Sequence, residues 1–295
     1  MIFERLLYNR DMTSTQVTFI GGGNMASAII GGLLTRGASP QSIRVVDPDA
    51  SVCERLKAEK GIDATQTLEA AWLGVDVVVL AVKPQVMPEA LEQLAALWPA
   101  SNPPMVMSVA GGITIDRMAK TLGAQAIVRC MPNTPALVGA GITALVGNAL
   151  TSAEHQQLAS HLMDQVGTHV WLDDESLLDL VTAVSGSGPA YFFALAEHMI
   201  NAASARGMDD ALAKALVHQT ALGAGKMLGA EGMDASTLRR NVTSPGGTTE
   251  AALTVFDSAD FGATVDQAIE AAWQRAQALG QTATPSSPTP KPQET

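Results

Sequence analysis

The feature that most constrains the fold is a glycine-rich turn close to the N-terminus. A short apolar run leads into residues 21–23, all glycine, and an apolar segment typical of a helix follows. Gly21 permits a tight turn, Gly23 lets a phosphate approach the backbone, and Ala26 leaves room for close helix–strand packing. The helix N-terminus then presents unpaired N–H groups and the positive end of its dipole. The turn predicts a dinucleotide pyrophosphate site, although similar turns join strands to helices in other folds.

Apolar runs alternate with helical patterns up to about Trp171, which is typical of a parallel sheet with crossover helices. The run at 75–82 is so uniformly apolar that it predicts a central strand buried on both faces. The predicted strands are 16–20, 43–47, 75–82, 105–109 and 126–131, with helices at 27–35 and 51–60. We expect an α/β Rossmann domain with a doubly wound, mostly parallel sheet.

A turn with few bulky side chains follows each of the five predicted strands. Because ligands of such sheets bind beyond the carboxyl ends of the strands, these turns predict a cofactor groove. Each turn taken alone is also an ordinary way to end a strand. The predicted cofactor-binding residues are Gly21, Gly23, Asn24, Met25, Ala26, Asp47, Ala81, Val82, Lys83, Pro84, Ala110, Gly111 and Asn133.

Asp47 bears on the choice between NADH and NADPH. It closes the second predicted strand, where an acidic side chain accepts hydrogen bonds from the adenosine ribose and repels a 2′-phosphate. That position favours NADH. The alternative is that Asp47 opens a turn and caps the next helix. Arg44, Arg55 and Lys57 remain candidates for contact with a phosphate, so both cofactors stay open.

Composition narrows the function classes. The chain has 295 residues, 47% of them hydrophobic, and a formal net charge of −11, which offers no basic face for nucleic acid or an anionic membrane surface. A small-molecule substrate is expected instead. Cys53 and Cys130 are the only cysteines and have no metal-type spacing, so we expect no metal site and a reducing compartment. With no membrane span or signal core visible, we expect a cytoplasmic protein.

The second half of the chain is helical in pattern. Predicted helices cover Ser187–Ala205, Asp209–Leu228 and Asp260–Ala278. Their apolar residues occupy more than one stripe, so we expect burial against a second copy of the chain. The predicted domains are an N-terminal extension (1–14), a dinucleotide-binding Rossmann domain (15–172), an all-helical substrate and dimerisation domain (173–280), and a disordered tail (281–295).

Two further glycine-rich segments interrupt the helical half, at Ser185–Tyr191 and Thr243–Glu250. The second reads Thr-Ser-Pro-Gly-Gly-Thr-Thr-Glu and leads into a helix expected to end near Phe256. Such a helix start gathers backbone N–H groups and hydroxyls at one place, which predicts a carboxylate receptor. The alternative is an ordinary helix start with no ligand.

Together, these motifs strongly resemble the pyrroline-5-carboxylate reductase family, and the resemblance runs from about Thr15 to Ala278. The matching segments are Phe19–Ala26, Ala81–Gln85, Arg129–Pro135, Ser185–Tyr191 and Thr243–Glu250. The resemblance implies reduction of 1-pyrroline-5-carboxylate to L-proline, the last step of proline biosynthesis. It also implies NADPH as the usual cofactor and a homodimer, with larger rings of dimers known. By the same resemblance, Ser244, Gly246, Gly247, Thr248 and Thr249 bind the substrate, with Thr249 as the catalytic residue nearest the ring nitrogen.

The motifs include no evident general acid, which agrees with the chemistry of imine reduction. A cyclic imine is basic enough to arrive protonated, so its reduction needs little acid catalysis. One alternative is a 3-hydroxyacid-dehydrogenase-like oxidoreductase, a family that relies on a lysine in the first long helix after the sheet, yet residues 187–199 contain none. Another is a non-catalytic nucleotide-sensing protein, which needs no carboxylate receptor.

Overall fold

The computed structural model describes residues 15–282 except 231 and 233. The predicted extension and residues 283–295 of the predicted tail lie outside that range. Two compact units divide the chain: the first runs through Gly186 and takes in the chain again from Trp273, and the second comprises Ser187–Ala272. The first unit therefore extends beyond the boundary expected at residue 172. Gln281 and Thr282, expected in the tail, continue the last helix.

The first unit contains an eight-stranded sheet of order β3-β2-β1-β4-β5-β6-β7-β8. Every pairing is parallel except that of β6 with β7, which confirms the mostly parallel Rossmann sheet. The strands are β1 Val17–Ile20, β2 Ile43–Val46, β3 Asp63–Thr65, β4 Val77–Leu80, β5 Met105–Ser108, β6 Ile127–Met131, β7 Gly141–Gly147 and β8 Gly167–Trp171. As predicted, β4 is fully buried between two parallel neighbours.

Three of these strands, β3, β7 and β8, were not expected. β3 has only three residues and begins with an exposed aspartate, so its sequence carries almost no strand signal. β8 is the edge strand, and its residues alternate between half-buried and exposed. β7 turns back antiparallel to β6 after the 3₁₀ turn Thr134–Val138. An apolar run that follows such a turn does not fit the strand–helix alternation used to find the other strands.

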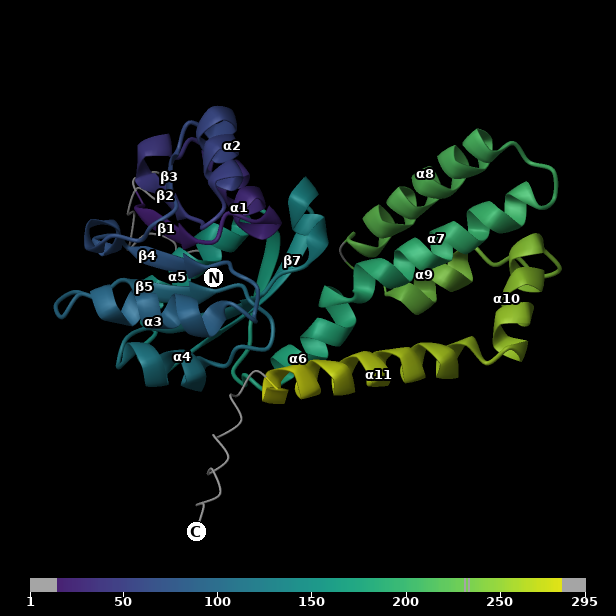
Figure 1. The fold of residues 1–295 in the computed structure, drawn as a ribbon. Coiled ribbons are helices and arrows are strands. Elements are labelled where there is room, and N and C mark those ends of the chain that lie inside the picture. The colour runs from purple at the N-terminus through teal and green to yellow at the C-terminus, as the bar shows by residue number, and fades with distance from the viewer. Residues whose placement is uncertain (1–14, 231, 233, 283–295) are drawn as a thin grey trace, which may run out of the picture. The chain divides into compact units, whose positions relative to one another are not determined.

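Helices cover both faces of this sheet (Figure 1). One core contains side chains of α1 (Asn24–Thr35), α2 (Ala50–Lys60) and α5 (Ala153–Asp164). The other contains those of α3 (Met87–Leu97) and α4 (Ile115–Leu122). Successive β4 residues alternate between the two cores, because side chains of a strand point to opposite faces. The doubly wound architecture is confirmed.

The N-terminal stretch of the first unit ends in α6 (Leu177–Val181) and a π-helical turn, Thr182–Gly186. The chain between Asp173 and Val184 thus forms two short helical segments. Asp174 lies before α6, where its carboxylate accepts hydrogen bonds from the backbone N–H and hydroxyl of Ser176.

The second unit is helical, as expected. Its helices are α7 Gly188–Ser204, α8 Asp210–Leu228, α9 Ala235–Asn241, α10 Thr248–Ser258 and the beginning of α11 Phe261–Thr282. Asp209 caps α8 by accepting the Leu212 N–H at 3.1 Å. Large apolar side chains are exposed on these helices in the single chain, and Phe192 and Phe193 of α7 are 66% and 67% exposed. This exposure agrees with the pattern that predicted a second copy.

Candidate functional site

The three glycines after β1 serve different purposes. Gly21 has φ +99°, and a Cβ there would lie 2.7 Å from the Ala81 carbonyl oxygen. A Cβ on Gly22 would lie 2.6 Å from Val52 Cγ1 of α2. A Cβ on Gly23 would meet no protein atom within 4 Å, and the φ of Gly23 is −67°. The fold itself requires the first two glycines, whereas the third leaves open space at the start of α1.

The N-terminus of α1 faces that space and has the chemistry of an anion site. The helix begins at Asn24, earlier than the predicted Ser27, and Gly23 at its N-cap provides no side-chain hydrogen bond. No acidic residue lies in the first turn. The first N–H groups of a helix have no intrahelical acceptor, so they suit a pyrophosphate. Ala26 is fully buried, as close packing of α1 against the sheet requires.

Asp47 lies immediately after β2 and reaches the glycine turn. Its Oδ2 accepts the Gly22 N–H at 2.8 Å, and its Oδ1 accepts the Asp49 N–H at 3.0 Å. Asp49, not Asp47, caps α2 by accepting the Ser51 N–H. Hydrogen bonds from the Ser51 hydroxyl and then from its N–H lower the pKa of Asp49. The carboxylate of Asp47 therefore holds the end of β2 against the glycine turn.

The other predicted cofactor residues of the turns after β4 and β5 lie at the same edge of the sheet, because these strands run parallel to β1. The Ala81 N–H donates to the Ile20 carbonyl at 2.8 Å. Val82 and Pro84 are half-buried, and the Lys83 side chain is exposed. Ala110 is buried, and its N–H donates to Ser108 Oγ at 3.3 Å. The structure therefore gathers the residues of these turns where a nucleotide is expected.

Asn133 follows β6, and its side-chain amide is engaged on both sides. Its Nδ2 donates to the Ser185 carbonyl at 3.1 Å, and its Oδ1 accepts the Ile142 N–H at 3.0 Å. These bonds join the end of β6 to β7 and to the π-helical turn. The side chain of Asn133 thus connects segments of the first unit, and this structural role explains the residue without a contact to a ligand.

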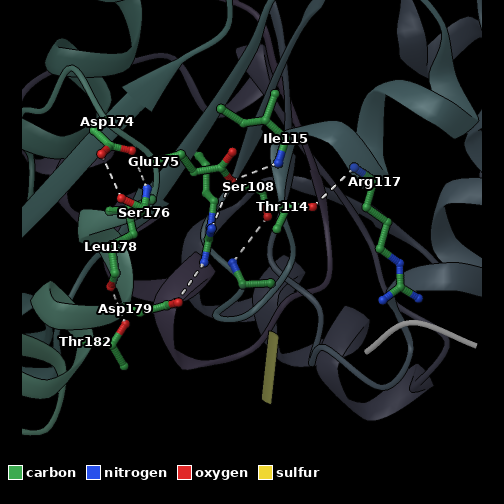
Figure 2. A network of polar contacts seen from close by, with 12 residues as sticks. Ser108, Thr114, Ile115, Arg117, Asp174, Glu175, Ser176, Leu178, Asp179 and Thr182 are labelled. Carbon is green, nitrogen blue, oxygen red and sulfur yellow. Dashed lines mark hydrogen bonds and ion pairs between the residues drawn. The ribbon is translucent and has the colours of Figure 1, made fainter. Parts of the chain in front are cut away.

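A buried ion-pair network, which the sequence analysis missed, holds α6 against the sheet. The side chain of Arg129 on β6 is only 7% exposed; its Nη1 lies 2.8 Å from Glu175 Oε1, and its Nη2 lies 3.9 Å from Asp179 Oδ1. Figure 2 shows Glu175 also reaching the backbone of Ile115, whose N–H donates to it at 2.9 Å. Arg129 lies within a motif already noted, but no local pattern predicts its partners more than forty residues away.

The second unit carries the predicted substrate turn, Thr243–Glu250. Two of its N–H groups are bonded within the turn: that of Gly246 donates to Glu250 Oε2 at 2.7 Å, and that of Gly247 donates to the Ser244 carbonyl at 3.0 Å. Gly246 has φ +71°, a conformation that favours glycine. The turn is therefore shaped by its own hydrogen bonds.

Free donors remain at the start of α10. Gly247 is the N-cap and gives no side-chain hydrogen bond, so the N–H groups of Thr248 and Thr249 have no capping partner. Over the described part of the chain, the hydroxyls of Ser244, Thr248 and Thr249 also have no hydrogen-bond partner. These unpartnered groups are the donors on which the predicted carboxylate receptor depends, and the receptor stays a prediction.

Two features are absent from the described residues. Within residues 15–282, leaving aside 231 and 233, no group of three or more His, Cys, Asp or Glu side chains is arranged to hold a metal ion. In the same range, no helix is both long and apolar enough to span a membrane.

Two family models match the chain. Residues 16–112 match the family described as NADP oxidoreductase, coenzyme F420-dependent, and residues 175–279 match pyrroline-5-carboxylate reductase dimerisation. The first range contains the glycine turn and Asp47, and the second contains the Thr243–Glu250 turn. These matches support a nicotinamide cofactor and an oligomeric assembly.

Known proteins resemble the chain over nearly its whole length. A pyrroline-5-carboxylate reductase of Pseudomonas aeruginosa is 44% identical over 92% of this chain and 98% of its own. A solved Coxiella burnetii pyrroline-5-carboxylate reductase superposes with a TM-score of 0.85 at 38% identity, covering 90% of this chain and 98% of that one. A Plasmodium falciparum pyrroline carboxylate reductase with NADP bound gives a TM-score of 0.79 at 28% identity, covering 91% and 99%. These likenesses confirm the predicted fold and activity, and the chain belongs to the pyrroline-5-carboxylate reductase family.

Proposed function

We propose that this reductase binds its nicotinamide cofactor along the carboxyl edge of the sheet and its substrate at the start of α10. The cofactor would contact residues 21–26, Asp47 and the turns after β4 and β5. The substrate, 1-pyrroline-5-carboxylate, would place its carboxylate against the N-terminus of α10. The observation that carries the second half of this proposal is the cluster of donors without partners at Thr248 and Thr249.

In this reaction, the main task of these residues is to position the reactants, and proton transfer is secondary. The bound cofactor supplies a hydride to the imine carbon. Backbone N–H groups at a helix start stabilise a carboxylate without a charged side chain. The Thr249 hydroxyl would hydrogen bond at the ring nitrogen and fix the orientation of the ring. Holding two reactants at contact distance removes much of the entropic barrier, and no separate general acid is needed for an imine that is already protonated.

Substitution of Thr249 tests this assignment. We expect Thr249→Ala to lower kcat by about tenfold to a hundredfold with little change in cofactor affinity, because a hydrogen bond to a charged group stabilises by about 1.5–3 kcal/mol. Thr249→Ser keeps the hydroxyl and should retain most activity.

The matched control for this test is Thr254→Ala. Thr254 lies on the same helix, but its hydroxyl donates to the Glu250 carbonyl at 2.9 Å instead of facing the helix start. Both variants would be assayed with pyrroline-5-carboxylate and with a 3-oxo acid, using NADH and NADPH. An equal loss of activity in Thr249→Ala and Thr254→Ala would show that Thr249 has no specific role in catalysis. Turnover confined to the 3-oxo acid would overturn the substrate assignment.

We also propose that the enzyme is at least a homodimer, formed through the exposed apolar faces of the second unit, and that dimers associate into a ring. The exposed side chains of Phe192 and Phe193 support an interface on α7. Sedimentation at micromolar concentration should show no stable monomer, and Phe193→Glu should shift the protein toward the monomer.

A further inference from the structure

Asp47 alone does not explain how the protein recognises the adenosine ribose of its cofactor. The structure indicates a second residue for this role. Both carboxylate oxygens of Asp47 already accept backbone N–H groups, from Gly22 and from Asp49. Closing the glycine turn is therefore a sufficient reason for an acid at this position. The carboxylate stays negatively charged, so a 2′-phosphate bound nearby requires a cation that offsets its repulsion.

Three cations near the end of β2 were candidates for contact with a phosphate, and the structure separates them. Arg44 lies within β2, with its guanidinium carbon 5.8 Å from the centre of the Trp72 ring and its Nη1 donating to the Ala71 carbonyl at 3.3 Å. Lys57 lies on α2 two residues after Arg55, which is about 200° around a helix. It thus projects from roughly the opposite side of α2.

Arg55 is the cation whose head group lies at the glycine turn. Its Nη2 is 3.5 Å from the Gly22 carbonyl oxygen. Its Nη1 is 3.8 Å from Glu59 Oε2, in an i,i+4 ion pair whose side chains are 42% and 59% exposed. Exposed pairs of this kind stabilise a helix by only about 0.3–0.5 kcal/mol. The guanidinium is therefore weakly held and is able to turn toward a stronger anion.

Arg55 and Asp47 converge on the same residue. Asp47 accepts the N–H of Gly22, while Arg55 lies at its carbonyl. The adenosine ribose of a Rossmann dinucleotide lies at this end of β2, and an arginine nearby accommodates a 2′-phosphate. A guanidinium provides a planar fork of N–H donors that matches phosphate. We propose that Arg55 binds the adenosine 2′-phosphate of NADPH and thereby determines that this reductase uses NADPH efficiently despite Asp47. The inference rests on the proposed function only in needing a nicotinamide dinucleotide.

Equilibrium binding of two cofactor fragments tests this inference without any catalysis. Affinities for 2′-phospho-ADP-ribose and ADP-ribose would be measured by titration calorimetry for the full-length chain and for Arg55→Gln, Arg55→Lys and Lys57→Gln. We expect Arg55→Gln to weaken binding of the phosphorylated fragment by about tenfold or more, as for loss of one charge-assisted hydrogen bond. Its affinity for ADP-ribose should change less than twofold. Arg55→Lys should recover part of the loss, and Lys57→Gln should match the unsubstituted chain.

The outcomes separate this inference from the wider proposal. Equal weakening of both fragments by Arg55→Gln, or no weakening of either, would overturn the role of Arg55, as would an equal effect of Lys57→Gln. Retained ADP-ribose affinity shows that each variant is folded. The fragment titrations contain no pyrroline, so they do not depend on the proposed substrate site. If the reductase assay failed while the fragment affinities were as expected, the proposed substrate site would be overturned, and Arg55 would still be the residue that binds the 2′-phosphate.

Discussion

The Glu250 carboxylate accepts the Gly246 N–H at 2.7 Å, so an acid in the first turn of α10 closes the turn that precedes its own helix. This bond holds Gly246 in its left-handed conformation, with φ +71°. The bond also occupies one N–H group that was predicted to bind the substrate, and the Gly247 N–H donates to the Ser244 carbonyl, so we propose the N–H groups of Thr248 and Thr249 as the donors to the carboxylate. Glu250 is thus a positioning residue for the substrate turn.

We predict that Glu250→Ala raises the KM for pyrroline-5-carboxylate several-fold, because the turn loses the hydrogen bond that orders it. Glu250→Gln keeps an acceptor oxygen for the Gly246 N–H and should largely restore KM. Steady-state kinetics with saturating cofactor measure both. If the glutamine variant is as impaired as alanine, then the charge of Glu250 matters and its hydrogen bond does not.

The glycines after β1 give a second prediction. Gly23→Val should leave the fold stable, because its φ of −67° suits any residue and no protein atom lies within 4 Å of the new Cβ. It should nevertheless abolish cofactor binding by filling the space expected for the pyrophosphate. Gly21→Val should destabilise the protein itself, since its Cβ would lie 2.7 Å from a carbonyl oxygen at φ +99°.

Thermal denaturation and cofactor titration on both variants separate these effects. A Gly23→Val protein that binds the cofactor with unchanged affinity would contradict the assignment of the pyrophosphate site. A Gly21→Val protein with unchanged stability would contradict the steric account of the turn.

The buried ion pair of Arg129 gives a third prediction. Arg129→Met should lower the free energy of unfolding by on the order of 3 kcal/mol, because it leaves two acidic side chains without their cation. Glu175 and Asp179 are 28% and 27% exposed, so water will offset part of this cost. Urea denaturation measures the change. Combining Arg129→Met with Glu175→Gln should recover stability, and additive losses in the double variant would show that the two residues do not interact.

A fourth prediction concerns pH. Hydrogen bonds from Ser236 and Thr237 lower the pKa of Asp234, the N-cap of α9, from 3.8 to about 2. A lowered carboxyl pKa contributes stability above the unfolded value and loses it as the pH falls through the folded one. We therefore expect α9 to lose order as the pH falls from about 4 to about 2. An NMR titration of the Asp234 carboxyl carbon measures this pKa directly. Asp234→Asn keeps a capping side chain and should remove this part of the pH dependence; an Asp234 pKa near 3.8 would refute the account.

The sequence predicted the parts of the fold that depend on local pattern. The buried run of β4, the glycine turn and helix α8 were all predicted from neighbouring residues, and the structure has each of them. Three strands were missed: β3 is short, β8 lies at the edge of the sheet, and β7 follows a 3₁₀ turn. β3 and β8 carry little apolar signal of their own, because pairing with a neighbouring strand stabilises them.

In the candidate site too, contacts between residues distant in sequence could not be predicted. The role of Asp47 in cofactor binding stays a prediction, and its bond to Gly22 was not predictable because it depends on two chain segments meeting in space. The partners of Arg129 and Asn133 are likewise distant in sequence. Residue types and spacing predicted a substrate turn at Thr243–Glu250, whereas the bond between Glu250 and Gly246 depends on the exact path of the backbone.

The most direct test of the account is the fate of a labelled hydride. The purified chain would be incubated with pyrroline-5-carboxylate and NADPH or NADH carrying deuterium at the transferable C4 position, and the product analysed by NMR and mass spectrometry. We predict L-proline with a single deuterium at C5, formed by the unsubstituted chain and strongly reduced in Thr249→Ala. Formation of no proline, or of proline without deuterium at C5, would contradict hydride transfer to the imine carbon by this protein.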